Sequence, residues 1–272
     1  MPESKDLDLD TLRAKQGFIC DMDGVIYHGN RLLEGVAAFV DWLNAEDKRF
    51  LFLTNSSERA PRELMAKLAR MGLAVDESHF YTSALATASF LRSQMPGASL
   101  YVIGEPGLVG ALYEAGFTMN EVNPDYVVVG ETRAYSFEKI EHAIHLILGG
   151  AKLIATNPDL TGPTEQGIAP ACRALVSPIE LASGRAAYYV GKPNPLMMRH
   201  AIKRLGVPVE QTAIVGDRMD TDIIAGIESE IDTVLVLSGV TTKEMINSFP
   251  YRPHYILNNV GAIPPPEFRR HE

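Results

Sequence analysis

The sequence predicts an α/β protein built around a parallel sheet. Short apolar runs alternate along the chain with longer segments in which apolar residues recur at helical spacing. Several of the apolar runs are followed directly by polar segments containing Asp, Asn or Lys. Strands that alternate with helices form βαβ units, and ligands bind beyond the carboxyl ends of their strands. We therefore expect these polar segments to line one functional site.

The first part of the chain contains two such units. We expect strands at residues 18–20 and 50–53, with a helix at 35–45 between them. A second helix begins near Pro61, because proline suits the first helical turn, and ends near Gly72. The order strand, helix, strand, helix is that of a parallel sheet.

The middle of the chain repeats the alternation with different residues. Its expected helices are 84–91, 108–115 and 137–148, and its expected strands are 100–103, 126–129 and 153–155. Loops rich in glycine and proline follow, and no comparable polar segment occurs here before Asn157. We therefore predict that residues 82–185 form a second α/β domain, inserted into a discontinuous core domain of residues 1–81 and 186–272.

The last part of the chain returns to the first pattern. We expect strands at 188–190, 213–215, 233–237 and 255–257, and helices at 195–205 and 221–227. Two of these strands end directly at polar segments, which ties this part of the chain to the same predicted site.

Composition excludes several classes of function. The chain has 272 residues, 46% of them hydrophobic, and a net charge of −9, which argues against a broad surface for a nucleic-acid polymer. Cys20 and Cys172 are too few for a disulfide framework, and Cys20 lies in an apolar run as a small buried hydrophobe would. The polar start, Met1–Asp10, does not resemble a signal peptide, and no apolar run is long enough to span a membrane. We expect a soluble cytoplasmic protein.

Four polar segments that follow strands carry the chemistry. They are Asp21-Met22-Asp23-Gly24, Thr54-Asn55-Ser56, Gly191-Lys192-Pro193 and Gly216-Asp217-Arg218. Asp21 stands nearest its strand and suits a nucleophile that forms an aspartyl-phosphate. Asp23 follows two residues later and suits a general acid that protonates the leaving oxygen and later takes a proton from water.

Two carboxylates would repel a phosphate group bound beside them, so the site needs a positive charge. Mg²⁺ bound by hard oxygen ligands would supply it, and Asp217 offers a further carboxylate. Asp222 falls about one helical turn later and could orient the ligands. The Thr54 hydroxyl, the backbone N–H groups near Asn55 and the Lys192 ammonium could bind phosphate oxygens.

These segments together resemble the haloacid dehalogenase superfamily. Further segments resemble its class IIA branch of NagD-type phosphatases: Tyr81–Ala84, Asn123–Tyr126, Val129–Arg133 and Ala155–Asp159. The resemblance implies a Rossmann-like core, an inserted α/β cap, and Mg²⁺-dependent hydrolysis of small phosphorylated metabolites such as nucleoside monophosphates or sugar phosphates.

The resemblance also assigns roles by position. Asp21 is then nucleophile and metal ligand, Asp23 is acid/base and binds the metal through its backbone carbonyl, and Asp217 is the remaining protein ligand. Thr54, Asn55 and Lys192 bind phosphate.

Some alternatives stay open at this point. Asn157 and Asp159 could contact substrate from the cap or could simply form a turn. Dehalogenation needs neither a metal nor an acid at Asp23, phosphonate cleavage would need an activated lysine such as Lys152, and phosphate-transferring mutases usually have another cap. A binding protein on an inactive scaffold would commonly have lost a ligand or the lysine. The cap could also form homo-oligomer contacts.

Overall fold

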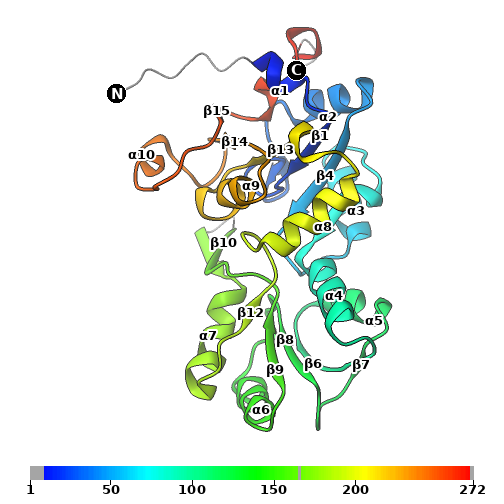
Figure 1. Cartoon of the computed structure of the whole chain (residues 1–272), viewed down its shortest axis with the longest axis vertical. Helices are drawn as coiled ribbons and strands as arrows, with labels where there is room; N and C mark the ends of the chain where they lie inside the picture. Colours follow the sequence, from blue (N-terminus) through cyan, green and yellow to red (C-terminus); the bar gives the residue numbers. More distant parts are fainter. Residues whose placement is uncertain (1–8, 165–166, 270–272) are drawn as a thin grey trace. The chain divides into compact units, whose positions relative to one another are not determined.

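The computed structural model describes residues 9–164 and 167–269 (Figure 1). The first eight residues, part of the predicted polar start, lie outside the described residues. The chain divides into two compact units. The first unit is Met1–Leu53, Lys67–Phe80 and Met198–Glu272, and the second unit is Thr54–Ala66 and Tyr81–Met197. The predicted insertion, residues 82–185, falls within the second unit, and its boundaries stay a prediction.

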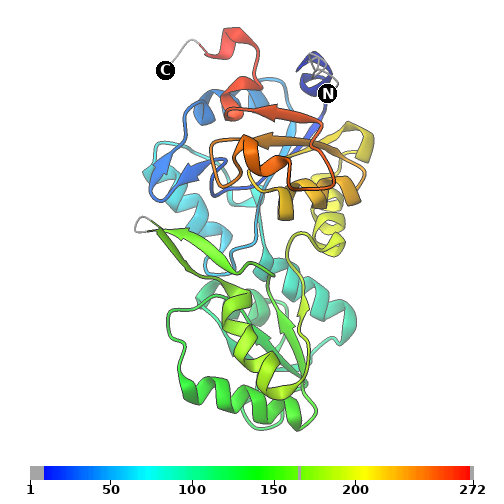
Figure 2. The same ribbon diagram turned by 90° about the vertical axis from the view of Figure 1, so that its left-hand side faces the viewer.

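The first unit contains the larger sheet, whose strand order is β15-β14-β13-β1-β4-β5. The strands are β1 (Gly17–Cys20), β4 (Arg49–Thr54), β5 (Phe80–Thr82), β13 (Thr212–Gly216), β14 (Asp232–Val236) and β15 (Tyr255–Leu257). Strand β1 lies between β13 and β4 and pairs with both in the parallel sense that the sequence predicts. Figure 2 shows β14 beside β15 at one edge of this sheet. β5 is an additional strand that the sequence analysis did not predict.

The buried face of α2 (Val36–Ala45) packs against β1. The ring of Phe18 meets the rings of Phe39 and Trp42 edge-on, at centroid distances of 6.0 and 5.4 Å. All three side chains are buried. The helix begins after Gly35, whose backbone has a φ of 79°. This aromatic group therefore anchors the strand that leads to Asp21.

The other helices of this unit differ from the prediction in three places: α1 and α10 were not predicted, and the helix expected at 221–227 has another form. The helices that have residues in the first unit are α1 (Leu9–Arg13), α2, α3 (Pro61–Arg70), α8 (Pro195–Leu205), α9 (Ile224–Glu228) and α10 (Lys243–Ile246). The expected helix at 221–227 is instead a π-helical turn, Met219–Ile223, followed by α9. In this wider turn the Asp222 side chain packs against Gly216, where a Cβ atom would lie 2.1 Å from Asp222 Cβ.

Short elements complete the first unit. They are a hairpin of β2 (Tyr27–His28) and β3 (Arg31–Leu32), and the 3₁₀ turns Glu77–His79, Val209–Gln211, Val260–Ala262 and Pro266–Arg269. Among the helices that the structure describes, none has the length and apolar character needed to cross a bilayer.

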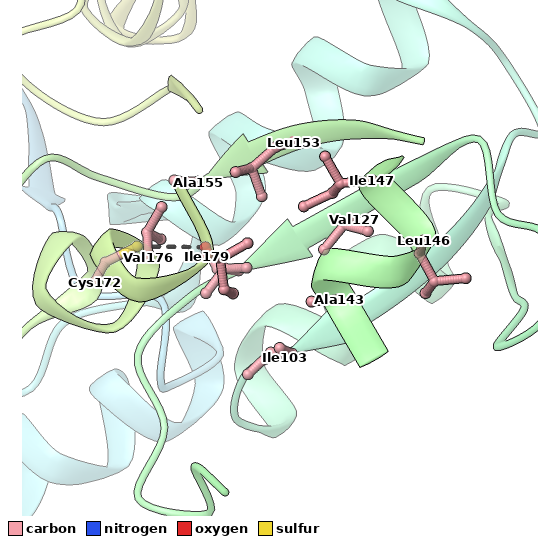
Figure 3. Packing of buried hydrophobic residues seen from close by; sticks show 11 residues of the cluster. Ile103, Val127, Ala143, Leu146, Ile147, Leu153, Ala155, Cys172, Val176 and Ile179 are labelled. Carbon is pink, nitrogen blue, oxygen red and sulfur yellow. Dashed lines mark hydrogen bonds between the residues drawn. The ribbon is translucent and has the colours of Figure 1, made fainter. Parts of the chain in front are cut away.

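The second unit is built on a smaller parallel sheet with the order β12-β9-β8-β6-β7. Its strands are β6 (Ser99–Ile103), β7 (Thr118–Met119), β8 (Tyr126–Val129), β9 (Lys152–Ala155) and β12 (Tyr188–Tyr189), and its helices are α4 (Ser83–Gln94), α5 (Pro106–Glu114), α6 (Phe137–Leu148) and α7 (Cys172–Ser183). Helices α6 and α7 pack together over one face of this sheet (Figure 3).

The core under α6 and α7 is almost wholly aliphatic (Figure 3). Alternate residues of β8, Val127 and Val129, face these helices, and Val176 and Ile179 of α7 cover them. Cys172 is buried here, and its thiol donates a hydrogen bond of 3.3 Å to the Val129 carbonyl, the dashed line in Figure 3. Both cysteines are buried thiols, as predicted for Cys20.

Strand β7, a hairpin and a helix of this unit were not predicted. The residues expected as loops form an antiparallel hairpin of β10 (Thr161–Thr164) and β11 (Gly167–Pro170), and α7 follows it. The hairpin is rich in glycine and proline, and α7 contains Pro178 in its interior. Neither composition favours regular structure by itself, so tertiary packing decides both elements.

Candidate active site

The predicted site residues belong to two groups, one in each unit. Those of the first unit are Asp21, Asp23, Asp217 and Asp222, and those of the second are Thr54, Asn55, Asn157, Asp159 and Lys192. Their roles stay predictions, and the structure gives the local geometry of each group.

Three carboxylates come together in the first unit. Asp21, Asp217 and Asp222 each offer an oxygen, and these oxygens all lie within 4.8 Å of one another. The register of the sheet explains the first two, because Cys20 pairs with Val215 in neighbouring parallel strands. The Asp21 N–H donates to the Val215 carbonyl at 2.8 Å, so Asp21 leaves β1 beside the end of β13.

Two glycines leave room for the Asp217 carboxylate. Its Oδ2 accepts a hydrogen bond of 2.6 Å from the Val240 N–H. A Cβ atom at Gly239 would lie 2.0 Å from that oxygen, and one at Gly24 would lie 2.6 Å from it. Gly24 also has a φ of 80°, a conformation that favours glycine. Backbone therefore closes around Asp217 where any side chain would collide with it.

Asp222 completes the acidic group from the π-helical turn. Its Oδ2 accepts a hydrogen bond of 3.2 Å from the Arg218 N–H. Asp217 and Asp222 are each 1% exposed. Gathering buried carboxylates is costly unless a cation neutralises them, and hard oxygen ligands suit a divalent metal ion. The donor set therefore fits the metal that the sequence analysis predicts at Asp21 and Asp217.

Asp23 makes a different contact. Its Oδ2 accepts a hydrogen bond of 3.2 Å from the Tyr27 hydroxyl, and the Gly24 N–H donates to the Tyr27 carbonyl at 2.9 Å. The ammonium of Lys67 lies 3.5 Å from the centre of the Tyr27 ring. Sequence reasoning missed both Tyr27 and Lys67, because no pattern in the chain joins α3 to the loop after β1.

In the second unit, Asn55 and Lys192 bind each other through two hydrogen bonds. Asn55 Oδ1 accepts from the Lys192 N–H at 2.7 Å, and Asn55 Nδ2 donates to the Lys192 carbonyl at 2.9 Å. Asn55 also donates to Asp159 Oδ2 at 3.0 Å. Lys192 is 1% exposed. Thr54 Oγ1 accepts from the Ser56 N–H at 3.1 Å, which shapes the turn after β4.

Asn157 is fully buried beneath this pair. Its amide donates to the Asn55 carbonyl at 2.7 Å and to Glu131 Oε1 at 2.5 Å. Desolvation raises the pKa of Glu131, and hydrogen bonds from Ser57 and Asn157 oppose that rise. Sequence reasoning noted Glu131 only as part of the motif Val129–Arg133. The side chains of Asn157 and Asp159 thus both contact Asn55.

Comparison with known proteins identifies the family. A haloacid dehalogenase-like hydrolase family matches residues 18–118, and a HAD-hydrolase-like family matches residues 189–263. The dihydroxyacetone phosphatase of Corynebacterium glutamicum is 45% identical over 246 residues, 90% of each chain. The ribonucleotide monophosphatase NagD of Escherichia coli K12 is 44% identical over 245 residues, 90% of this chain and 96% of NagD.

The chain belongs to the haloacid dehalogenase-like hydrolases. A solved structure of this family, a 4-nitrophenylphosphatase from Thermotoga maritima, matches with a TM-score of 0.89 and 34% identity, covering 92% of this chain and 97% of that one. The relatives confirm the NagD-type resemblance and the predicted fold class, a parallel-sheet core with an inserted α/β cap. This haloacid dehalogenase-like hydrolase is thus a phosphomonoesterase by family.

Proposed function

We propose that this chain hydrolyses small phosphorylated metabolites through an aspartyl-phosphate on Asp21, with Mg²⁺ held at Asp21, Asp217 and the Asp23 backbone carbonyl. The observation that carries the proposal is the meeting of Asp21, Asp217 and Asp222 within 4.8 Å. When bound, Mg²⁺ supplies the charge that offsets repulsion between the carboxylates and the phosphoryl oxygens.

The proposed reaction has two steps. The Asp21 carboxylate attacks phosphorus, the bond from phosphorus to the ester oxygen breaks, and Asp23 gives its proton to that leaving oxygen. Water then attacks the phosphorus of the aspartyl-phosphate and passes a proton to Asp23. Phosphate leaves, and Asp21 regains its free carboxylate. Both steps require Asp23 to sit where it can exchange a proton, and the hydrogen bond from Tyr27 restricts its rotation.

Three further residues are proposed to bind the phosphate group. Lys192 supplies a cation, Thr54 a hydroxyl, and the backbone near Asn55 its N–H groups. The hydrogen bonds between Asn55 and Lys192 fix these groups relative to one another before any substrate arrives. Such preorganisation is worth most where charge develops during the reaction.

The substrate is proposed only as a class. The relatives are named for dihydroxyacetone phosphate and for ribonucleotide monophosphates, two substrates that share only the phosphate ester. A small sugar phosphate or nucleoside monophosphate therefore fits equally well. Dehalogenation is disfavoured because it would need neither the acidic metal group nor the acid at Asp23.

Turnover of p-nitrophenyl phosphate with Mg²⁺ tests the proposal. We expect Asp21→Asn to lower kcat by about ten-thousandfold or more, because the variant lacks the nucleophile. Asp41→Asn, an exposed aspartate of α2, serves as the matched control and should keep full activity. An Asp21→Asn enzyme that keeps most of its activity would contradict the assigned nucleophile.

A further inference from the structure

We propose that Glu131 is a positioning residue for phosphate binding, acting on Lys192 through Asn157 and Asn55. The inference rests on the proposed function, because it takes Lys192 to be a phosphate ligand. It concerns a carboxylate that has no place in the chemical steps above. Each link is a hydrogen bond between described residues of the second unit.

The first link joins Glu131 to two neighbours. Its Oε1 accepts from the Asn157 amide at 2.5 Å, and its Oε2 accepts from the Ser57 N–H at 3.2 Å and from the Ser57 hydroxyl. Both carboxylate oxygens are therefore used as acceptors. A carboxylate suits this place because it presents two acceptors, whereas an amide would present one acceptor and one donor.

The second link fixes the turn after β4. Asn157 donates to the Asn55 carbonyl at 2.7 Å, and Ser83 Oγ donates to the same carbonyl. Asn157 and Ser83 are both 0% exposed. Because Glu131 occupies one hydrogen of the Asn157 amide, the other is left for the Asn55 carbonyl, with Thr156 Oγ1 a longer contact of the same nitrogen at 3.3 Å. Loss of Glu131 would leave a buried amide free to rotate away from that carbonyl.

The third link reaches the phosphate ligand. The Asn55 side chain binds the N–H and the carbonyl of Lys192 together, at 2.7 and 2.9 Å. This pair of bonds fixes both the position and the orientation of the Lys192 peptide. A displacement of Asn55 must therefore move the backbone from which the lysine side chain extends.

Tight packing at two glycines makes the chain of contacts stiff. A Cβ atom at Gly191 would lie 2.7 Å from both Asn157 Cβ and Asn55 Oδ1. One at Gly130 would lie 2.6 Å from Ser57 Oγ. Close-packed atoms have no free space into which they can move. A displacement at Glu131 therefore also displaces Asn157 and Asn55.

The test measures phosphate affinity in the Glu131→Gln variant of the full chain. Inorganic phosphate is the probe, as a competitive inhibitor of p-nitrophenyl phosphate hydrolysis. We expect Ki for phosphate and KM to rise together, about tenfold, because one acceptor facing Ser57 becomes a donor. Glu105→Gln is the control, since Glu105 Oε1 accepts from Thr132 Oγ1 and the Arg133 N–H but does not touch Asn157. Its Ki should equal that of the wild type.

A double-mutant cycle separates positioning from general destabilisation. If Glu131 acts through Asn157, Glu131→Gln combined with Asn157→Ala raises Ki no further than the worse single variant. Additive effects, or a lowered Tm with an unchanged Ki, would overturn the inference. If Glu131→Gln fails to fold, Ser57→Ala takes its place, because it removes the hydroxyl donor to the carboxylate. We expect it to raise Ki about threefold. An unchanged Ki in Ser57→Ala would contradict the inference.

Lys192→Ala distinguishes the two proposals. If phosphate Ki is unchanged in Lys192→Ala, the phosphate site of the proposed function is wrong. If Lys192→Ala weakens phosphate binding and Glu131→Gln does not, only the positioning role is wrong.

Discussion

The hydroxyl of Tyr27 donates a 3.2 Å hydrogen bond to the carboxylate of Asp23, the proposed acid/base. The Lys67 ammonium lies 3.5 Å from the centre of the same ring, and both Tyr27 and Lys67 are buried. A cation over the face of a desolvated ring is strongly attracted to it. The two contacts fix Tyr27, and Tyr27 in turn restricts the rotation of Asp23.

Removal of the Tyr27 hydroxyl should slow catalysis without weakening substrate binding. We expect Tyr27→Phe to lower kcat by about fivefold with little change in KM, since a typical hydrogen bond is worth about 1 kcal/mol. Tyr251→Phe is the matched control, because that hydroxyl donates to the Met219 carbonyl at 3.0 Å and not to Asp23. Equal kcat values for Tyr27→Phe and the wild type would show that the hydrogen bond has no catalytic role.

Chelation should abolish activity, and the acidic group should govern its recovery. We expect no turnover in EDTA and full recovery on adding excess Mg²⁺. Asp217→Asn should lower kcat/KM by about 100-fold and raise the Mg²⁺ concentration for half-maximal activity, because a charged ligand is lost.

Asp220→Asn is the control for this metal-dependence experiment, since Asp220 is exposed and pairs with Arg218 at 2.9 Å. If Asp217→Asn retained the wild-type Mg²⁺ dependence, the assigned ligand would be wrong.

Two glycine-to-alanine changes should have opposite effects on stability. Gly191→Ala places a methyl group 2.7 Å from Asn55 Oδ1 and is expected to lower the free energy of unfolding by about 2 kcal/mol. Gly110 lies inside α5 with nothing within 4 Å of its would-be Cβ. Gly110→Ala should raise that free energy by about 0.5–1 kcal/mol. Urea denaturation of both variants decides the point, and a Gly191→Ala protein as stable as the wild type would contradict the packing.

The second unit should lose stability in alkali. Burial raises the pKa of the Cys172 thiol from 9.0 to about 12, and the charge of Glu131 adds to the rise. Burial also raises the pKa of Tyr135 from 10.0 to about 12 and raises that of Tyr189. A folded state that keeps its protons to higher pH is fully stable below the unfolded pKa. That stability is lost as the pH rises from about 9 towards 12.

Urea denaturation between pH 7 and pH 11 measures this loss. Cys172→Ala should flatten the decline that begins near pH 9, because the variant has no thiol to ionise on unfolding. If the free energy of unfolding depends on pH identically in Cys172→Ala and the wild type, groups other than Cys172 cause its decline.

Much of the fold follows from local patterns in the sequence. The apolar runs and helical spacing predict β1, α2, β4 and β13 close to their observed bounds, because each pattern reflects the face that an element buries. Helix α7 escapes prediction, since Pro178 lies inside it and a glycine- and proline-rich hairpin precedes it. The strand order could not be predicted, because β1 lies between β13 and β4. These strands come from distant parts of the chain, and the periodicity of apolar residues indicates only local structure.

Some contacts of the candidate site can be predicted from the sequence, and others cannot. Polar segments that follow the strands of one parallel sheet lie at the same edge, so a shared site for Asp21 and Asp217 could be predicted from the sequence. That their strands are neighbours could not. The contacts of Glu131 and Asn157 could not, because buried polar networks depend on tertiary distances and leave no period in the sequence. The proposed cap contacts with substrate and with a second copy of the chain stay predictions.

Trapping of the covalent intermediate reveals which residue carries the phosphate during turnover. The enzyme is mixed with substrate and Mg²⁺, quenched in acid within one turnover, digested, and analysed by mass spectrometry for phosphorylated peptides. We expect phosphate on Asp21, lost on treatment with hydroxylamine and absent from Asp21→Asn. Rapid turnover with no phosphorylated peptide, or with phosphate on another residue, would contradict this expectation.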